Sequence, residues 1–134
     1  MKVVLDTNVV VSAILFGGTP RIILEAAFEG AIQAFISDQM IEELESVLTR
    51  PRFGLNKRIV QNIINEITNI AEWIEPKRSC KIIKDDPSDD MMLDCAIEAK
   101  VDCIVTGDNH LLALNEFEGI AIVTPKVFQQ TYLA

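Results

Sequence analysis

The sequence predicts an α/β fold in which a central parallel sheet is flanked by helices on both faces. Short apolar segments at 2–6, 32–36, 103–105 and 121–123 have the length and composition of buried strands. Segments with helical periodicity separate them, and capping residues precede several of these segments. Strands that alternate with helices along a chain are typical of parallel sheets, because a helix is needed to return the chain to the starting edge.

Length and composition fit one domain. The chain has 134 residues, 49% of them hydrophobic, which is enough apolar surface for a core. It contains no internal repeat, low-complexity tract or long linker, so we predict a single domain over residues 1–134. No apolar run is long enough to span a membrane, and Asp6 interrupts the apolar N-terminus. We therefore expect a cytoplasmic protein without membrane contact.

Glycine, proline and capping residues set the predicted helix boundaries. In the first half of the chain we expect helices at 9–16, closed by Gly17 and Gly18; at 20–29, capped by Thr19 with Pro20 at the first helical position; and at 38–49, capped by Ser37 and stopped by Pro51. In the second half we expect helices from Asn56 through Ile74, over 88–100 with Ser88 as cap, and from Thr124 and Pro125 to the C-terminus. The apolar stripe of the long fourth helix indicates core or dimer packing.

The charge distribution is uneven. The net charge of −8 is unusual for a protein that binds nucleic acid, since phosphate contacts use lysine and arginine. Eight of the twelve basic residues lie within 50–84, whereas 85–108 carries eight acids and only Lys100. Of the basic residues, Arg50 and Arg52 are weak candidates for contact with a phosphate backbone; helix-end or surface charge is the simpler interpretation.

The three cysteines, Cys80, Cys95 and Cys103, are an odd number and lack CxxC spacing. Two of them lie in apolar helix or strand patterns, so we expect buried thiols rather than disulfides or a zinc site. His110 is the only histidine, which excludes a zinc centre built on several histidines, and we expect it in a loop or at a helix start. Glycine-rich phosphate loops are also absent from the sequence.

Acidic residues follow two of the predicted strands. Asp6 ends the first strand and Asp108 comes just after the 103–105 strand. Because ligands of open parallel sheets bind at the carboxyl ends of the strands, we expect both side chains at the same edge. Two carboxylates about 5 Å apart repel by roughly 3 kcal/mol at an effective dielectric near 20, so a cluster of them needs cations or protons.

Helical projection selects further acids. On the 38–49 helix, Glu43 borders the apolar face, whereas Glu42 and Glu45 point away. On the 88–100 helix, Asp90 borders the buried face, and Asp94 lies one turn later and slightly further out. The neighbouring acids are expected in solvent or near the positive end of the helix dipole: Asp85, Asp86 and Asp89. The predicted cluster is therefore Asp6, Glu43, Asp90 and Asp108, with Asp94 as a secondary fifth member.

The polar residues next to these acids can have either of two roles. They can act as caps and turn residues, or they can orient the carboxylates by hydrogen bonding. The residues in question are Thr7, Asn8, Ser37 and Thr106.

Taken together, the motifs resemble those of PIN-domain proteins, in particular the toxin components of toxin–antitoxin systems related to VapC-type ribonucleases. The matching segments, in chain order, are Val4-Leu5-Asp6-Thr7-Asn8-Val9, Ser37 with Glu43-Leu44, Arg50-Pro51-Arg52-Phe53, the 86–93 segment DPSDDMML, and the 104–112 segment IVTGDNHLL. The resemblance covers almost the whole chain.

This resemblance implies that Asp6, Glu43, Asp90 and Asp108 bind one or two Mg²⁺ or Mn²⁺ ions. The implied reaction is metal-assisted hydrolysis of an RNA phosphodiester. The family also suggests a homodimer and an antitoxin partner. Two alternatives remain open from the sequence: a PIN-like module that binds RNA or a partner without cutting it, and a receiver-like phosphoacceptor domain.

Overall fold

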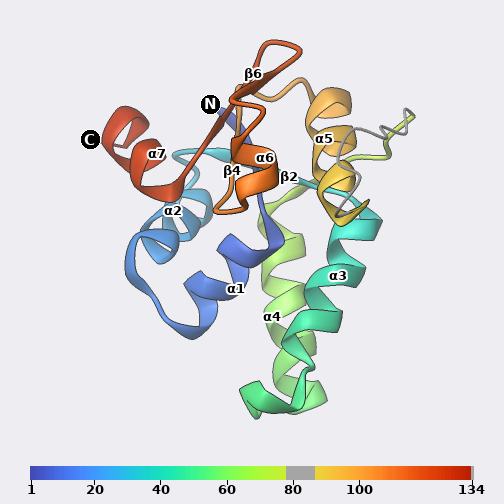
Figure 1. Ribbon diagram of the computed structural model, residues 1–134. Helices are drawn as coiled ribbons and strands as arrows, with labels where there is room; N and C mark the ends of the chain where they lie inside the picture. The colour runs from blue at the N-terminus through green and yellow to red at the C-terminus, as the bar shows by residue number, and fades with distance from the viewer. Residues whose placement is uncertain (78–86, 134) are drawn as a thin grey trace.

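A six-stranded sheet with the order β3-β2-β1-β4-β6-β5 forms the centre of the structure, a computed structural model that describes residues 1–77 and 87–133 (Figure 1). The strands are β1 (Lys2–Leu5), β2 (Gln33–Ile36), β3 (Glu72–Trp73), β4 (Cys103–Val105), β5 (Glu116–Phe117) and β6 (Ile120–Val123). The helices are α1 (Thr7–Leu15), α2 (Gly18–Phe28), α3 (Asp38–Leu48), α4 (Lys57–Ile70), α5 (Pro87–Ala99), α6 (Asn109–Leu112) and α7 (Pro125–Tyr132), with a 3-10 turn η1 (Pro51–Phe53).

The order in which the chain adds strands reverses at the centre of the sheet. Strand β1 pairs in parallel with β2 on one side and with β4 on the other. The chain moves outward from β1 to β2 and β3, and then returns to the opposite side of β1 through β4, β6 and the antiparallel edge strand β5. Such a switch point leaves a crevice at the carboxyl ends of the two central strands, which is where ligands of open α/β sheets bind.

Helices cover both sides of the sheet, as predicted. Helix α5 contacts β1, β2 and β4, and α2 and α7, which contact each other, lie on the opposite side (Figure 1). Helices α3 and α4 pack side by side and extend away from the sheet, with η1 at their far end. The central strands β1 and β4 are buried because both of their faces are covered. The predicted α/β class is therefore confirmed.

Three predicted helix caps are present. The Ser37 hydroxyl accepts a hydrogen bond from the backbone N–H of Met40, and Asn56 Oδ1 accepts one from the third residue of α4 at 2.9 Å. Thr124 caps α7, with Pro125 at its first position. These side chains satisfy N–H groups that have no partner within the first turn of the helix.

Other predicted boundaries were wrong. Helix α1 begins at Thr7 rather than Val9, because Asp6 itself caps it. Helix α2 begins at Gly18, so Thr19 is inside the helix; Gly17, with φ of 80°, makes the turn before it. Helix α5 begins at Pro87, one residue before the predicted cap Ser88, which fits the preference of proline for the first helical turn.

The predicted long helix through Ile74 was also wrong. Helix α4 ends at Ile70, and Ala71 adopts extended backbone with ψ of 144°. The next two residues form β3 and pair with Phe35 and Ile36 of β2. Backbone pairing at the sheet edge replaces the helix here, although Ile70 and Ile74 keep an i, i+4 spacing that is typical of a helix.

Cys95 and Cys103 are free and buried, as predicted, and Cys80 lies outside the described residues. Burial, and to a lesser extent the neighbouring carboxylates Asp94 and Asp102, raise the pKa of Cys95 and of Cys103 to about 12. Over residues 1–77 and 87–133, no single helix is long and apolar enough to cross a membrane; α1 and α2 meet such a criterion only as a pair bent by 102°.

Candidate active site at the carboxyl edge of the sheet

Buried polar side chains of the described residues gather in one region. They are Asp6, Thr7, Ser37, Asp90, Asp94 and Thr106. Four of them directly follow the carboxyl ends of β1, β2 and β4. Asp90 lies in the first turn of α5 and Asp94 near its middle, and because the end of α5 leads into the start of β4, the start of α5 lies toward the carboxyl edge. Burying polar groups is costly unless they serve each other or a ligand, so this region is the candidate site.

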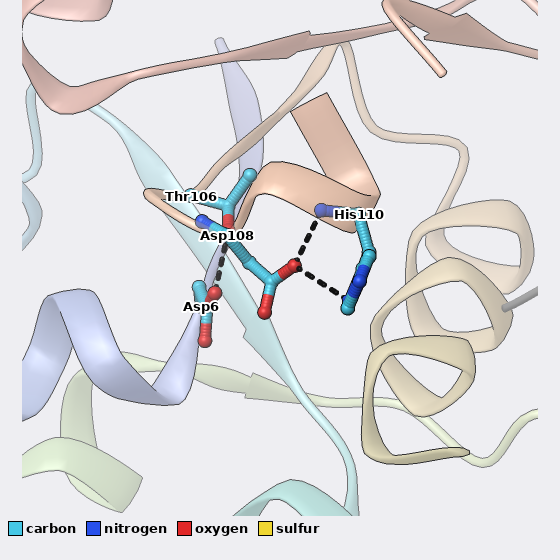
Figure 2. Close-up of polar contacts among 4 residues, drawn as sticks. All are labelled: Asp6, Thr106, Asp108 and His110. Carbon is cyan, nitrogen blue, oxygen red and sulfur yellow. Dashed lines mark hydrogen bonds and ion pairs between the residues drawn. The ribbon is translucent and has the colours of Figure 1, made fainter. Parts of the chain in front are cut away.

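Thr106 connects the two strand-end carboxylates. Its hydroxyl donates a hydrogen bond of 2.5 Å to Oδ2 of Asp6, and its oxygen accepts one of 3.0 Å from the backbone N–H of Asp108. Asp6 is 1% exposed and Thr106 is fully buried. Figure 2 shows one carboxyl oxygen of Asp6 turned toward the Thr106 hydroxyl, and the carboxyl group of Asp108 turned toward His110. The register of β1 against β4, with Leu5 opposite Val105, places these residues side by side.

Asp108 also caps α6. Its Oδ1 accepts a hydrogen bond of 2.7 Å from the backbone N–H of His110, and Nδ1 of the His110 ring lies 3.7 Å from the same oxygen (Figure 2). The side chain of Asp108 is 22% exposed, in contrast to that of Asp6. His110 lies in the first turn of α6, as predicted. One strand-end carboxylate is therefore buried and fixed, and the other faces solvent.

Glu43 lies on α3, whose contacts include α1 and α5. Its side chain is partly buried and its Oε2 atom is shielded from solvent, whereas Glu42 and Glu45 are exposed. The helical projection that separated Glu43 from its two neighbours is thus reflected in the burial of the three side chains.

Asp90 and Asp94 on α5 are equally buried, each at 8% exposure. The prediction that Asp94 lies slightly further out than Asp90 was wrong, because the two side chains are buried to the same extent. Asp85 and Asp86 lie outside the described residues, as does the side chain of Asp89.

The other polar neighbours have different contacts. Asn8 approaches Asp6 through its backbone N–H, which donates to Oδ1 at 3.0 Å, while its side chain is exposed. Ser37 is occupied as the cap of α3. The Thr7 hydroxyl is buried and has no hydrogen-bond partner among the described residues. Of the four predicted orienting side chains, Thr106 is the one with a described contact to a candidate carboxylate.

A groove of about 460 Å³ adjoins Asp108. Its volume lies in the range of small-molecule sites, roughly 300–1,000 Å³. It is lined by Asn8, Val9, Ser12, Pro20, Gly107, Asp108, Asn109 and Pro125. Among the described residues that line it, Asp108 is the only charged one; the others are two asparagines, one serine, two prolines, Val9 and Gly107. Ser12 and Asn109 were not predicted, because neither lies at a strand end or on a periodic face. Arg50 and Arg52 do not line this groove.

Carboxylates are oxygen ligands that suit hard cations such as Mg²⁺ or Mn²⁺. Among residues 1–77 and 87–133, however, no three histidine, cysteine, aspartate or glutamate side chains lie close enough together to hold a metal ion. Asp6 and Asp108 are brought together through Thr106, whereas Glu43 and Asp90 lie on two separate helices, α3 and α5. The chemistry of the donor set fits a divalent cation, and the complete ligand set stays a prediction.

Comparison with known proteins adds to this picture. A family profile described as "PIN domain" matches residues 2–110. The uncharacterized protein MJ1680 of Methanocaldococcus jannaschii is 30% identical over 121 residues, which cover 87% of this chain and 76% of that protein. Two crystal structures have similar folds. VapBC2 from Rickettsia felis, bound to a DNA fragment from its promoter, has a TM-score of 0.64 at 17% identity, and FitAcB from Neisseria gonorrhoeae has 0.55 at 15%; each match covers 92% of this chain and 98% of the other.

Proposed function

This chain belongs to the PIN domain family, and on that premise we propose that it is a divalent-metal-dependent endoribonuclease that hydrolyses RNA phosphodiester bonds. PIN domains are generally nucleases and typically use divalent metal ions. The observation that carries the proposal is the linkage of Asp6 to Asp108 through Thr106, at the switch point of the sheet. Two acids held together at the ligand-binding edge are suited to a cation and, through it, to a phosphate.

In this proposal Asp6, Glu43, Asp90 and Asp108 hold the metal, and Asp94 is the secondary candidate for a fifth ligand. A bound divalent ion supplies Lewis-acid stabilisation of the negative charge that develops on the phosphate during hydrolysis. Asp6 is fixed before any ion binds, because its Oδ1 accepts a hydrogen bond from Asn8 N–H and its Oδ2 accepts one from Thr106 Oγ1.

Asp108 presents its carboxyl group toward the groove, where it is accessible to substrate. We place the nucleoside next to the scissile phosphate in this groove. Its amide and hydroxyl groups can hydrogen-bond to base or ribose, and its proline rings offer flat apolar contact. The low charge of the groove avoids repulsion of the phosphates on either side of that nucleoside.

We further infer that the protein acts in the cytoplasm as the toxin of a toxin–antitoxin pair, with an antitoxin protein and a second copy of this chain as partners. The resemblance to VapC-type toxins and the similar fold of VapBC2 support this role. Co-purification with the product of a neighbouring short reading frame tests the antitoxin, and light scattering tests whether the mass is twice the 14.9 kDa of one chain.

The nuclease proposal is tested by cleavage of single-stranded RNA with Mg²⁺ or Mn²⁺. Cleavage should stop with EDTA, and Asp6→Asn and Glu43→Gln should each abolish it. Glu42→Gln is the matched control on the same helix, since Glu42 is exposed, and it should cleave normally. Circular dichroism shows whether each variant is folded. Full activity of Asp6→Asn, or cleavage that continues in EDTA, would contradict the mechanism.

Metal binding has a readout that does not depend on cleavage. Calorimetric titration with Mn²⁺ should show binding to the wild-type protein and none to Asp6→Asn. If the wild-type protein binds RNA but does not cut it with either metal, the chain is a non-cleaving PIN module instead.

A further inference from the structure

The far end of the α3–α4 pair carries exposed positive charge in an acidic protein. Between Glu45 and Glu66 the chain has four cationic residues and no carboxylate, although the whole chain has a net charge of −8. All four are exposed, and we call them the basic tip: Arg50, Arg52, Lys57 and Arg58. They lie around η1 and in the first turn of α4, at the end of the pair that is remote from the sheet (Figure 1).

Two of these charges lie where the helix dipole disfavours positive charge. Lys57 and Arg58 occupy the first turn of α4, where the backbone N–H groups already produce a positive potential and negative side chains are preferred. That turn contains no acid, and none of the four cations forms an ion pair with another described residue. Local stability therefore does not account for this placement, and an external anion would relieve the repulsion.

The tip is anchored rather than loosely attached. Phe53 and Leu55 are partly buried and pack against the core, and Asn56 caps α4. The guanidinium of Arg52 lies 4.8 Å from the centre of the Phe53 ring, in cation–π geometry. Anchored cations lose less conformational freedom when they bind a ligand, which favours recognition.

The position of the tip relative to the candidate site fits a long substrate. Glu43 and Arg50 are seven positions apart along α3 and its end, which corresponds to about 10 Å at 1.5 Å per residue. An extended single strand of RNA needs only a few nucleotides to cover this distance. An RNA chain cut at the carboxyl edge can thus extend to the tip.

From these observations we propose that the basic tip binds the phosphate backbone of RNA outside the cut site. This inference rests on the proposed ribonuclease function and assigns its substrate a second point of attachment. An acidic protein is the less suitable partner, because protein interfaces usually have an apolar centre. The exposed neighbours of the tip on α4 are mostly amides, namely Gln61, Asn62 and Asn65, and these suit phosphate and sugar contacts.

The test compares two double variants of equal charge. Lys57→Gln/Arg58→Gln removes two tip charges, and Lys2→Gln/Lys100→Gln removes two exposed charges at the amino ends of β1 and β4. Each has a net charge two units below that of the wild-type protein, so general electrostatic attraction changes equally. Binding of a labelled 20-nucleotide single-stranded RNA is measured by anisotropy in EDTA from 50 to 200 mM salt.

We expect the tip variant to bind RNA about tenfold more weakly than the control at low salt. Its plot of log affinity against log salt should be shallower by roughly 1.4, since each phosphate contact with a single strand contributes about 0.7. The proposal that the basic tip binds RNA would be overturned if the two double variants had the same RNA affinity and the same salt slope. It would also be overturned if the tip variant lost antitoxin binding while its RNA binding was unchanged.

The binding assay separates this inference from the proposed function. If RNA binding depends on the tip but the wild-type protein does not cleave RNA with Mn²⁺, the proposed nuclease function is contradicted. The proposed binding of RNA by the basic tip is then still supported. If the wild-type protein cleaves RNA but the two double variants bind RNA equally well, only the proposed role of the basic tip is contradicted.

Discussion

The hydroxyl of Thr106 donates a 2.5 Å hydrogen bond to Oδ2 of Asp6, across the parallel pairing of β1 and β4. A short O–H···O⁻ bond of this kind is about twice as strong as one between neutral groups. It fixes the orientation of a carboxylate that is almost fully buried, and the same hydroxyl oxygen holds the backbone of Asp108. One side chain thus sets the relative position of the two strand-end acids.

Replacing Thr106 with valine tests this arrangement, because valine keeps the shape and removes the hydroxyl. We expect Thr106→Val to lower RNA cleavage and Mn²⁺ affinity by about 10- to 100-fold, which is typical of losing a group that orients a metal ligand. The free energy of unfolding should fall by about 1–3 kcal/mol, since Asp6 and Asp108 N–H lose a buried partner. Thr106→Ser is the control and should retain most activity; a valine variant with wild-type cleavage and metal affinity would contradict the role.

Asp90 and Asp94 are the two candidate metal ligands on α5. Asp94 is as buried as Asp90, yet it lies four residues further along α5, about 6 Å from Asp90 along the axis and away from the carboxyl edge. We therefore expect Asp90→Asn to reduce Mn²⁺ affinity at least tenfold and Asp94→Asn to reduce it by no more than about threefold. Calorimetry of the two variants decides this, and the reverse order of effects would make Asp94 the principal ligand of α5.

The two buried thiols predict a loss of stability in alkali. The pKa of Cys95 and of Cys103 is about 12 in the folded protein, compared with an ordinary value of 9.0. The folded state therefore keeps its thiol protons between about pH 9 and 12 while the unfolded state loses them, so stability is full below pH 9 and falls above it.

We expect each thiol to contribute a slope of about −1.4 kcal/mol per pH unit in that window. Urea unfolding at pH 8.5 and pH 10.5 measures it, and Cys103→Ala should show a smaller decrease between the two values than the wild-type protein. In the native protein at pH 8, neither of these two thiols should react with a thiol reagent until urea is added. Rapid native labelling of Cys95 or Cys103, identified by peptide mapping, would show that the sites open readily.

The acids at strand ends could be predicted from sequence because the reasoning is local. An apolar strand followed by Asp6, or by Thr106-Gly107-Asp108, places a carboxylate at the ligand edge of any parallel sheet. The hydrogen bond between Thr106 and Asp6 could not be assigned in the same way. It depends on β1 pairing with β4 in one register across 100 positions of sequence, and no local pattern fixes that register.

Helix caps could be predicted from local sequence, whereas short edge strands could not. Ser37, Asn56 and Thr124 were correctly identified as caps, because the interaction spans three residues. The two-residue strands β3 and β5 were missed, since they form by pairing with distant partners. A signal for β5 was nonetheless present: Glu118 and Gly119 adopt φ of 50° and 85°, as in a two-residue hairpin turn, and the sequence Glu-Gly between apolar segments is compatible with it.

The groove beside Asp108 offers the last test, since we place a nucleoside in it. Ser12 lines this groove from α1 and is partly buried, so Ser12→Phe should fill part of the 460 Å³ volume without touching a candidate metal ligand. We expect kcat/KM for RNA to fall at least tenfold, mainly through KM, because the substrate loses a contact made in both ground state and transition state. Mn²⁺ affinity should be unchanged. Thr131→Phe, at an exposed position of α7, controls for the added ring. Cleavage at the wild-type rate and KM by Ser12→Phe would show that the RNA strand takes another path past Asp108.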